Sequence, residues 1–362
     1  MKVLVAKKFL NAALQKLARV VPPRNNNPIL SYTRLTTTHQ GFHLEGTNLE
    51  LDLRFFVPAQ VEGTAQLALP AHLFAQIVSK LPGETVEMSL QSGNVTVSSG
   101  GSNYKLQTGD VSQFPTIEIL EGTAKVKGAG FKQALSNTLY CVANEAFQQV
   151  FRAQKVECTP ERLRVVCSDG FRLAYFQVDG LDLTGNYLIP NKSAKEIAHL
   201  IDDQEGEITL AANTFRKQLS IHGNGWSLNT KLMDGEFPDY QRIVPSNIKA
   251  TVNVRTSVLQ EALNRTAVMC DSSLNNRIEL QISDNKLHLW AENDYGKADE
   301  VLEVEHIGDP ISLGFNVRFL SDAIKPITDE YTTLQLSGAT TPAAIKGSQD
   351  TAYLSVVVPL RI

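Results

Sequence analysis

The residue types that most often carry out catalysis are scattered along this 362-residue chain. The seven histidines form no H-E-x-x-H pair for zinc, and none lies in a serine or cysteine nucleophile motif. No G-x-x-x-x-G-K-[ST] phosphate loop occurs. The four cysteines, Cys141, Cys158, Cys167 and Cys270, fit no C-x-x-C zinc pair, so we expect reduced thiols in a cytoplasmic protein. The sequence therefore predicts a non-enzymatic protein without a metal or cofactor.

Two short motifs look like ligand sites but have simpler explanations. The segment 128–130, Gly-Ala-Gly, lacks the third glycine of a dinucleotide turn, and Lys125 and Lys127 break up the strand that should precede it. We therefore expect a linker between repeats there. The acidic run that starts at Asp202-Asp203 is typical of a polar turn before a strand at 207–211, and not of a metal cluster.

The elements around these residues alternate between two periodicities. Apolar residues recur at every second position on both sides of Asn, Gly or Asp turns, which is typical of antiparallel hairpins with one buried face. These hairpins are predicted at 86–97, 208–228 and 278–289. No long βαβ run occurs, so we expect antiparallel sheets in an α+β protein and not a doubly wound nucleotide fold. No stretch is apolar enough to predict a membrane span.

Helix-period segments recur at a nearly constant spacing. Six are predicted, at 7–20, 71–80, 130–143, 191–201, 255–267 and 316–327. Ala-Leu pairs at 13–14, 134–135 and 262–263 are 121 and 128 residues apart, and the alternate helices follow Pro70, Pro190 and Asn316 at offsets of 120 and 126. We interpret these offsets as three structural repeats, each with two helices on antiparallel sheets, over 1–123, 124–247 and 248–362. The alternative is a single large β-rich protein with incidental helices.

Positive charge is concentrated in the predicted helices. The whole chain has a formal net charge of −4, yet the six segments contain twelve lysines and arginines against three acidic residues. Solvated helix faces would explain the basic residues, but that explanation also predicts glutamate, which is nearly missing there. Helices that share one surface would attract phosphates without distinguishing bases.

Six segments, spread in order over the whole chain, resemble one known family. They are NPILSYTRL (27–35), GTNLELDL (46–53), SDGFRLAYF (168–176), KLMDGEFPDYQRIVP (231–245), GFNVRFLSDAI (314–324) and VVVPLRI (356–362). Together they resemble the bacterial sliding clamp, the beta subunit of DNA polymerase III. The resemblance implies the DNA clamp fold, with three domains of one topology per protomer and a homodimer that closes head to tail into a ring. It also implies a processivity factor that encircles double-stranded DNA without sequence preference.

The resemblance implies three groups of site residues. The pocket for partner peptides would comprise Phe151, Ser168, Gly170, Phe171, Arg172, Leu173, Pro238, Arg242, Ile243, Pro342, Val356, Val357, Val358, Pro359, Leu360, Arg361 and Ile362. The DNA-binding positions would be Arg24, His72, Gln149 and Lys192, to which the helix charge adds Lys80, Arg318 and Lys325. The dimer interface would join Tyr104, Lys105 and Leu106 to Val268, Met269, Glu300 and Glu303.

From the residues alone, simpler interpretations of the pocket remain open. Asp169-Gly170 is a good two-residue hairpin turn, and Val356–Val358 is typical of a buried strand. Phe171 and Phe151 stand where the family often has histidine and an aliphatic residue, so the pocket would be more aromatic.

Three hypotheses follow for the function. The leading one is a clamp that binds the replicative polymerase, the clamp loader and other proteins with a clamp-binding motif, in the cytoplasm and at the nucleoid during replication. The second is a monomeric β-rich binding module whose helices are basic by accident. The third is a hydrolase or transferase with a site assembled from unpatterned Asp, Ser and His residues.

Overall fold

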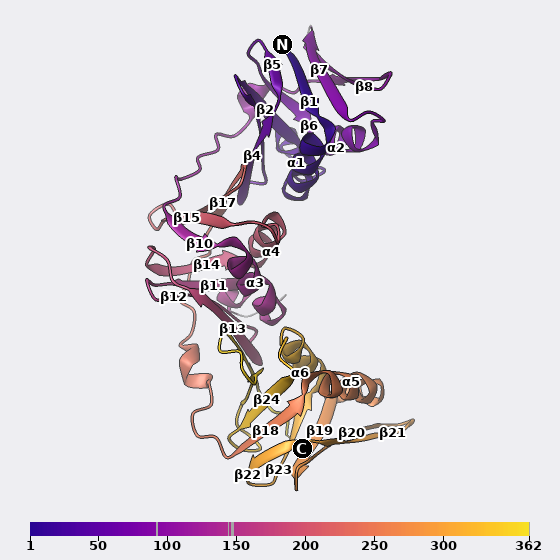
Figure 1. Ribbon diagram of the computed structural model, residues 1–362, viewed down its shortest axis with the longest axis vertical. Helices are drawn as coiled ribbons and strands as arrows, with labels where there is room; N and C mark the ends of the chain where they lie inside the picture. Colours follow the sequence, from indigo (N-terminus) through magenta and orange to yellow (C-terminus); the bar gives the residue numbers. More distant parts are fainter. Residues whose placement is uncertain (92, 144, 146–147, 362) are drawn as a thin grey trace. The chain divides into compact units, whose positions relative to one another are not determined.

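The computed structural model describes residues 1–91, 93–143, 145 and 148–361. They form two units (Figure 1). The first comprises Met1–Lys132, Leu181–Leu183 and Lys192–Leu232, and the second comprises Gln133–Gly180, Thr184–Asn191 and Met233–Ile362. Within the described residues, no helix is both long and apolar enough to cross a membrane.

The first unit contains two antiparallel sheets. The five-stranded sheet has the order β5 (Gln60–Glu62), β1 (Lys2–Ala6), β7 (Thr85–Gln91), β8 (Asn94–Ser99), β9 (Ser102–Gln107). The eight-stranded sheet has the order β10 (Ala124–Lys127), β15 (Glu207–Asn213), β16 (Gln218–Gly223), β17 (Trp226–Lys231), β4 (Leu51–Pro58), β3 (Gly41–Thr47), β2 (Tyr32–Thr38), β6 (Gln66–Pro70). Because β17 pairs with β4, this sheet continues from the first sequence repeat into the second.

The second unit repeats this plan. Its nine-stranded sheet has the order β14 (Gly185–Pro190), β11 (Ala153–Cys158), β12 (Arg162–Ser168), β13 (Arg172–Asp179), β26 (Tyr353–Val357), β25 (Ala343–Gly347), β24 (Tyr331–Leu336), β18 (Ala250–Arg255), β22 (Glu305–Gly308). Its four-stranded sheet has the order β21 (Gly296–Glu303), β20 (Lys286–Asn293), β19 (Arg277–Ser283), β23 (Ile311–Asn316). The pairing of β13 with β26 joins the second repeat to the third.

Each of the six helices begins at the residue after a strand. They are α1 (Lys7–Val20), α2 (Ala71–Lys80), α3 (Gly128–Thr138), α4 (Asn191–Leu200), α5 (Thr256–Thr266) and α6 (Val317–Ile324). In α1 the buried residues include Leu10, Leu14 and Leu17, which lie on one face at helical spacing. This strand-then-helix unit occurs twice per repeat, so the predicted pair of helices on antiparallel sheets is confirmed.

The three predicted hairpins are also confirmed, as β7–β8, β15–β16–β17 and β19–β20. Two predictions about α3 are wrong. The segment 128–130 is the first turn of α3 and not a linker, because the helix begins directly after β10. The same helix ends at Thr138 and not at 143, and a 3-10 turn at Leu139–Cys141 follows it.

Candidate functional site

Twelve residues of the second unit line an apolar cavity of about 210 Å³. They come from the connection between β12 and β13, from residues 237–243, from Phe151 and from the C-terminal end of β26. The lining residues are Phe151, Ser168, Gly170, Phe171, Arg172, Leu173, Phe237, Pro238, Tyr240, Ile243, Val356 and Val358. An apolar concave surface with a few polar groups is the usual form of a ligand site.

Side-chain hydrogen bonds hold the turn that forms one wall. Asp169 Oδ1 accepts hydrogen bonds from the backbone N–H groups of Phe171 and Arg172, at 2.9 and 3.0 Å. Ser168 Oγ accepts from Gly170 N and donates to the Arg172 carbonyl. Gly170 has φ +90°, which favours glycine. The connection therefore has three residues outside the strands, and not the two expected, and it leaves the Phe171 side chain 64% exposed at the cavity mouth.

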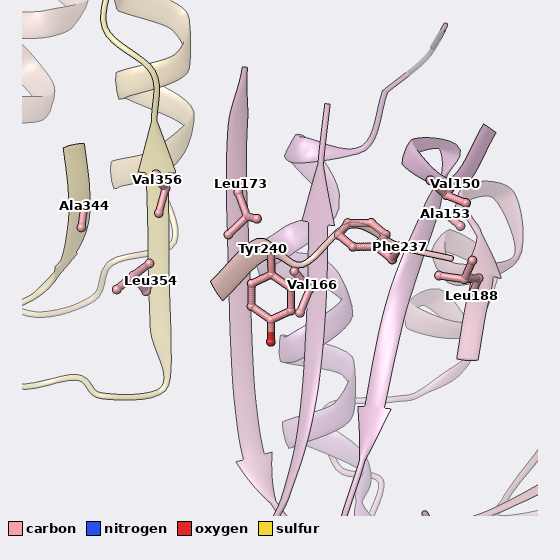
Figure 2. Close-up of a cluster of buried hydrophobic side chains, with 10 residues drawn as sticks. All are labelled: Val150, Ala153, Val166, Leu173, Leu188, Phe237, Tyr240, Ala344, Leu354 and Val356. Atoms are coloured by element: carbon pink, nitrogen blue, oxygen red, sulfur yellow. The ribbon is translucent and has the colours of Figure 1, made fainter. Parts of the chain in front are cut away.

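The floor of the cavity is the aromatic pair Phe237 and Tyr240. Figure 2 shows the Tyr240 ring beside the strands that carry Leu173 and Val166, and the Phe237 ring on the other side of the Val166 strand, and these four residues belong to one buried apolar cluster. The Phe237 ring also meets the Phe151 ring edge to face, with centroids 5.8 Å apart.

Behind the cavity floor, a network of polar side chains holds the Tyr240 hydroxyl in place. Its hydroxyl donates to Glu157 Oε2 at 2.7 Å and accepts from Arg164 Nη1 at 3.0 Å. Burial raises the pKa of Tyr240 to about 12, the bond to Glu157 adds to this effect, and Arg164 opposes it. The Lys155 ammonium lies over the rings of both Phe237 and Tyr240, 5.9 and 5.5 Å from their centroids, and adds a cation–π contact to each.

Arg172 is the one charged side chain among the described lining residues, and it is held on several sides. Its Nε donates to Asp169 Oδ2 at 2.9 Å, its Nη1 to Asp322 Oδ2, and its Nη2 to the Tyr140 carbonyl at 2.8 Å. The guanidinium also lies 4.4 Å from the centre of the Phe319 ring. Burial alone would lower the pKa of Arg172, but the hydrogen bonds to Asp322 and Asp169 raise it above its ordinary value.

The C-terminal segment forms another wall. Val356 and Val358 line the cavity, whereas Val357 is fully buried, because successive side chains of a strand point to opposite faces. The Val358 N–H donates to the Phe171 carbonyl at 3.0 Å, and the Leu360 N–H donates to the Gly314 carbonyl of β23 at 2.7 Å. The chain therefore leaves the cavity after Val358 and follows the edge of β23.

The structure brings ten of the seventeen predicted pocket residues around this cavity. Six others do not line it: Arg242, Pro342, Val357, Pro359, Leu360 and Arg361. The Arg242 side chain is exposed and paired with Asp239. Ile362 lies outside the described residues. The sequence prediction omitted Phe237 and Tyr240, although both lie inside the quoted segment at 231–245, where aromatic residues next to Pro238 were the available signal.

Ion pairs change the interpretation of the helix charge. Five of the twelve basic residues pair with carboxylates: Lys16 with Asp202, Arg19 with Glu196, Lys132 with Asp203, Arg255 with Glu330, and Arg265 with Glu300. Several of these acids lie just outside the predicted helix limits, so the charge contrast of the sequence analysis overstated the free positive charge.

The predicted DNA-binding residues fall into two groups. Arg24, Lys80, Gln149, Lys192, Arg318 and Lys325 are exposed. His72 is half-buried, and its Nε2 lies 2.8 Å from the Val21 carbonyl at the end of α1, so it has a structural contact of its own.

The predicted interface residues lie on or beside two sheet edges. Among the described residues, β9 pairs with β8 alone; Tyr104 and Lys105 are exposed on it, while Leu106 is buried in its own unit. Glu300 and Glu303 lie on β21, whose one neighbour in the described part of the chain is β20. Val268 is exposed and Met269 half-buried in the 3-10 turn after α5.

Comparison with known families covers almost the whole chain. Models of the DNA polymerase III beta subunit match residues 1–118 (N-terminal domain), 125–239 (central domain) and 241–361 (C-terminal domain). The three matches follow the order of the repeats, so the three-domain organisation is confirmed and the single β-rich protein is excluded.

Individual relatives agree along their full length. The beta sliding clamp of Vibrio cholerae is 28% identical over 369 residues, covering 100% of both chains, and that of Escherichia coli is 27% identical over 373 residues with the same coverage. Among solved structures, the sliding clamp of Pseudomonas aeruginosa bound to griselimycin superimposes with a TM-score of 0.95 at 27% identity, covering 100% of both chains. The DNA polymerase III beta subunit of Thermotoga maritima has a TM-score of 0.92 at 26% identity, covering 100% of this chain and 99% of that one.

Proposed function

The chain belongs to the family of DNA polymerase III beta subunits, and from this premise we propose that two copies close head to tail into a ring around duplex DNA. The beta subunit is a sliding clamp, a non-catalytic processivity factor of DNA replication. The enzyme and monomeric-module hypotheses are thereby set aside. The ring contacts phosphates and not base edges, because base-specific contacts would stop it from sliding.

The apolar cavity is the docking site for short peptide segments of the partners. The replicative polymerase, the clamp loader and other proteins with a clamp-binding motif insert apolar side chains there. The observation that carries this proposal is the cavity itself, which is lined by aromatic and aliphatic side chains. Arg242, Pro342, Pro359, Leu360 and Arg361 would contact the parts of the peptide that lie outside the cavity.

The dimer forms between two sheet edges, β9 of one protomer and β21 of its partner. Each edge carries a row of backbone N–H and C=O groups without a neighbouring strand, which is an aggregation risk unless a partner covers it. Joining the five-stranded sheet to the four-stranded one makes a sheet as large as the nine-stranded sheet within the chain. Tyr104 and Val268 supply exposed apolar surface for this contact.

The domains of each protomer span 1–123, 124–247 and 248–362, and the protein works in the cytoplasm, at the nucleoid during replication. The exposed cations Arg24, Lys80, Lys192, Arg318 and Lys325 contact the DNA backbone, with Gln149 as a neutral contact. His72 keeps its hydrogen bond to the Val21 carbonyl, so the exposed edge of its ring is the part that can contact DNA.

Replacing Phe171 tests the docking site. Phe171→Ala removes an exposed ring at the cavity mouth, so we expect the affinity for a fluorescein-labelled peptide ending in Leu-Phe to fall roughly tenfold or more. Fluorescence anisotropy measures the affinity, and thermal unfolding should be unchanged. Phe215→Ala is the matched control, since Phe215 is 95% exposed and does not line the cavity. Equal affinities of Phe171→Ala and wild type would refute the docking assignment.

A further inference from the structure

Two carboxylates bind Arg172, and each has a different structural role. Asp169 shapes the turn, since its Oδ1 accepts the backbone N–H groups of Phe171 and Arg172 while its Oδ2 accepts Arg172 Nε. Asp322 lies 150 positions further along the chain, on α6, a helix that contributes no residue to the described cavity lining. Its carboxylate reaches Arg172 Nη1 from outside the cavity.

We propose that Asp322 is a positioning residue of the peptide-binding cavity: it fixes the Arg172 side chain and thereby makes ligand affinity depend on α6. The inference rests on the proposed function, because it assumes that the cavity binds an apolar peptide. Asp322 itself does not touch the ligand and acts through Arg172.

The geometry around the guanidinium supports this role. The Arg172 side chain is 12% exposed, so a lost hydrogen bond there is replaced poorly by water. The Phe319 ring, also on α6, lies against the same guanidinium, so the helix holds Arg172 by charge and by stacking. With both contacts in place, the apolar stem of Arg172 can serve as cavity wall while its charged head is turned toward Asp169 and Asp322.

A series of hydrogen bonds continues from Arg172 into the nine-stranded sheet. Arg172 Nη2 donates to the Tyr140 carbonyl, and the Tyr140 hydroxyl donates to Ser355 Oγ at 2.8 Å. Ser355 Oγ in turn donates to the Leu173 carbonyl at 3.0 Å, and Tyr353 donates to the Ala323 carbonyl of α6 at 2.8 Å. The helix is thus tied to β13 and β26, two of the strands that carry cavity residues, and Asp322 is the link that reaches a lining side chain.

Asp322→Asn is a clean test, because the Asp322 side chain is 43% exposed and the substitution keeps its size. We expect the affinity for the Leu-Phe peptide to fall about threefold to tenfold. Asp322→Glu should restore it to within about twofold, since a carboxylate is again available. Glu330→Gln, which removes a carboxylate paired with Arg255 on an exposed surface, is the matched control and should bind as wild type does.

A double-mutant cycle separates positioning from a direct contact. In an Arg172→Ala background, Asp322→Asn should have no further effect on affinity, because its partner is gone. Wild-type affinity in Asp322→Asn, or additive losses in the double variant, would overturn the proposal.

Hydrogen exchange of the unliganded protein distinguishes this inference from the proposed function. Asp322→Asn should accelerate exchange of the amides at 169–172 by about tenfold and leave the β15–β16 hairpin unchanged. If exchange is faster in Asp322→Asn but the wild type binds no peptide, the docking site is refuted, whereas the role of Asp322 in positioning Arg172 is retained. If exchange of the amides at 169–172 is the same in Asp322→Asn as in wild type, the positioning role is refuted, whether or not the wild type binds the peptide.

Discussion

At the scale of single residues, the most deeply buried charge pairing lies in the first unit and not in the cavity. Glu45 on β3 lies between Arg34 on β2 and Arg54 on β4, and the three residues face one another across neighbouring strands. Arg34 Nε donates to Glu45 Oε2 at 2.6 Å, and Arg54 Nε donates to Oε1 at 2.8 Å. Burial alone raises the pKa of the Glu45 carboxyl, and the bonds from the two arginines more than reverse this, so its pKa lies below the ordinary 4.5.

We predict that Glu45→Gln lowers the free energy of unfolding by about 2–4 kcal/mol at pH 7, because two arginines lose their shared counter-charge in a site with little water. Urea denaturation measures this. Glu87→Gln, which breaks the exposed pair with Lys2, is the control and should cost less than about 1 kcal/mol.

The pH dependence follows from the lowered pKa. The folded state keeps Glu45 ionised at pH values where the unfolded chain already binds a proton, so the contribution is complete above pH 4.5 and is lost as pH falls through the folded pKa. The stability difference between wild type and Glu45→Gln should therefore shrink below pH 4.5. A difference that stays constant down to pH 3 would contradict the assignment.

At the scale of elements, a strand followed directly by a helix is the recurring unit, and only some of the helices carry cations that have no carboxylate partner among the described residues. Lys192 in the first turn of α4 and Arg318 in the first turn of α6 are exposed and have no carboxylate partner among the described residues. Lys16 and Arg19 on α1, by contrast, are neutralised by Asp202 and Glu196. A cation without a carboxylate partner releases more counterions from DNA when it binds a phosphate. We therefore expect the electrostatic part of the DNA affinity to come from the unpaired positions.

The salt dependence of DNA binding tests this difference. Lys192→Ala and Arg318→Ala should each reduce the slope of log affinity against log salt concentration by about 0.9, the value for one phosphate contact. Lys286→Ala, an exposed lysine on β20 outside the helices, should leave the slope unchanged. The prediction fails if all three variants have the same slope as wild type.

At the scale of the whole molecule, two of the four sheets cross from one sequence repeat to the next, through β17–β4 and β13–β26. Among the described residues, β9 is one edge strand of the five-stranded sheet, opposite β5, and β21 is one edge strand of the four-stranded sheet, opposite β23. Since sheets already continue from one repeat to the next within the chain, edges such as β9 and β21 are suited to join a second copy by the same kind of pairing.

Negative-stain imaging at micromolar concentration, without DNA or partners, checks the ring. We expect closed rings for wild type and for Phe215→Asp, and single protomers for Tyr104→Asp, which places a charge on the β9 edge. Wild-type particles without a central hole would rule out topological tethering to DNA.

Local elements and family membership could be predicted from the order of the residues alone. Alternating apolar residues around Asn and Gly turns identified the hairpins, because strand alternation depends on neighbours within a few positions. The recurrence of Ala-Leu pairs at offsets of 121 and 128 residues identified the repeats. Short motifs such as SDGFRL and VVVPLRI identified the residues that line most of the cavity.

The contacts between these elements became known from the folded chain. The register of β13 against β26 places Arg172 opposite Val357, and α6 then brings Asp322 to the same guanidinium. Tertiary packing also places Phe237 and Tyr240 on the cavity floor, and it pairs helix cations with carboxylates that lie far away in the sequence. Local spacing did not predict these contacts, because their energy depends on residues that lie far apart in the sequence, such as Tyr240 and Glu157 at 83 positions and Lys16 and Asp202 at 186.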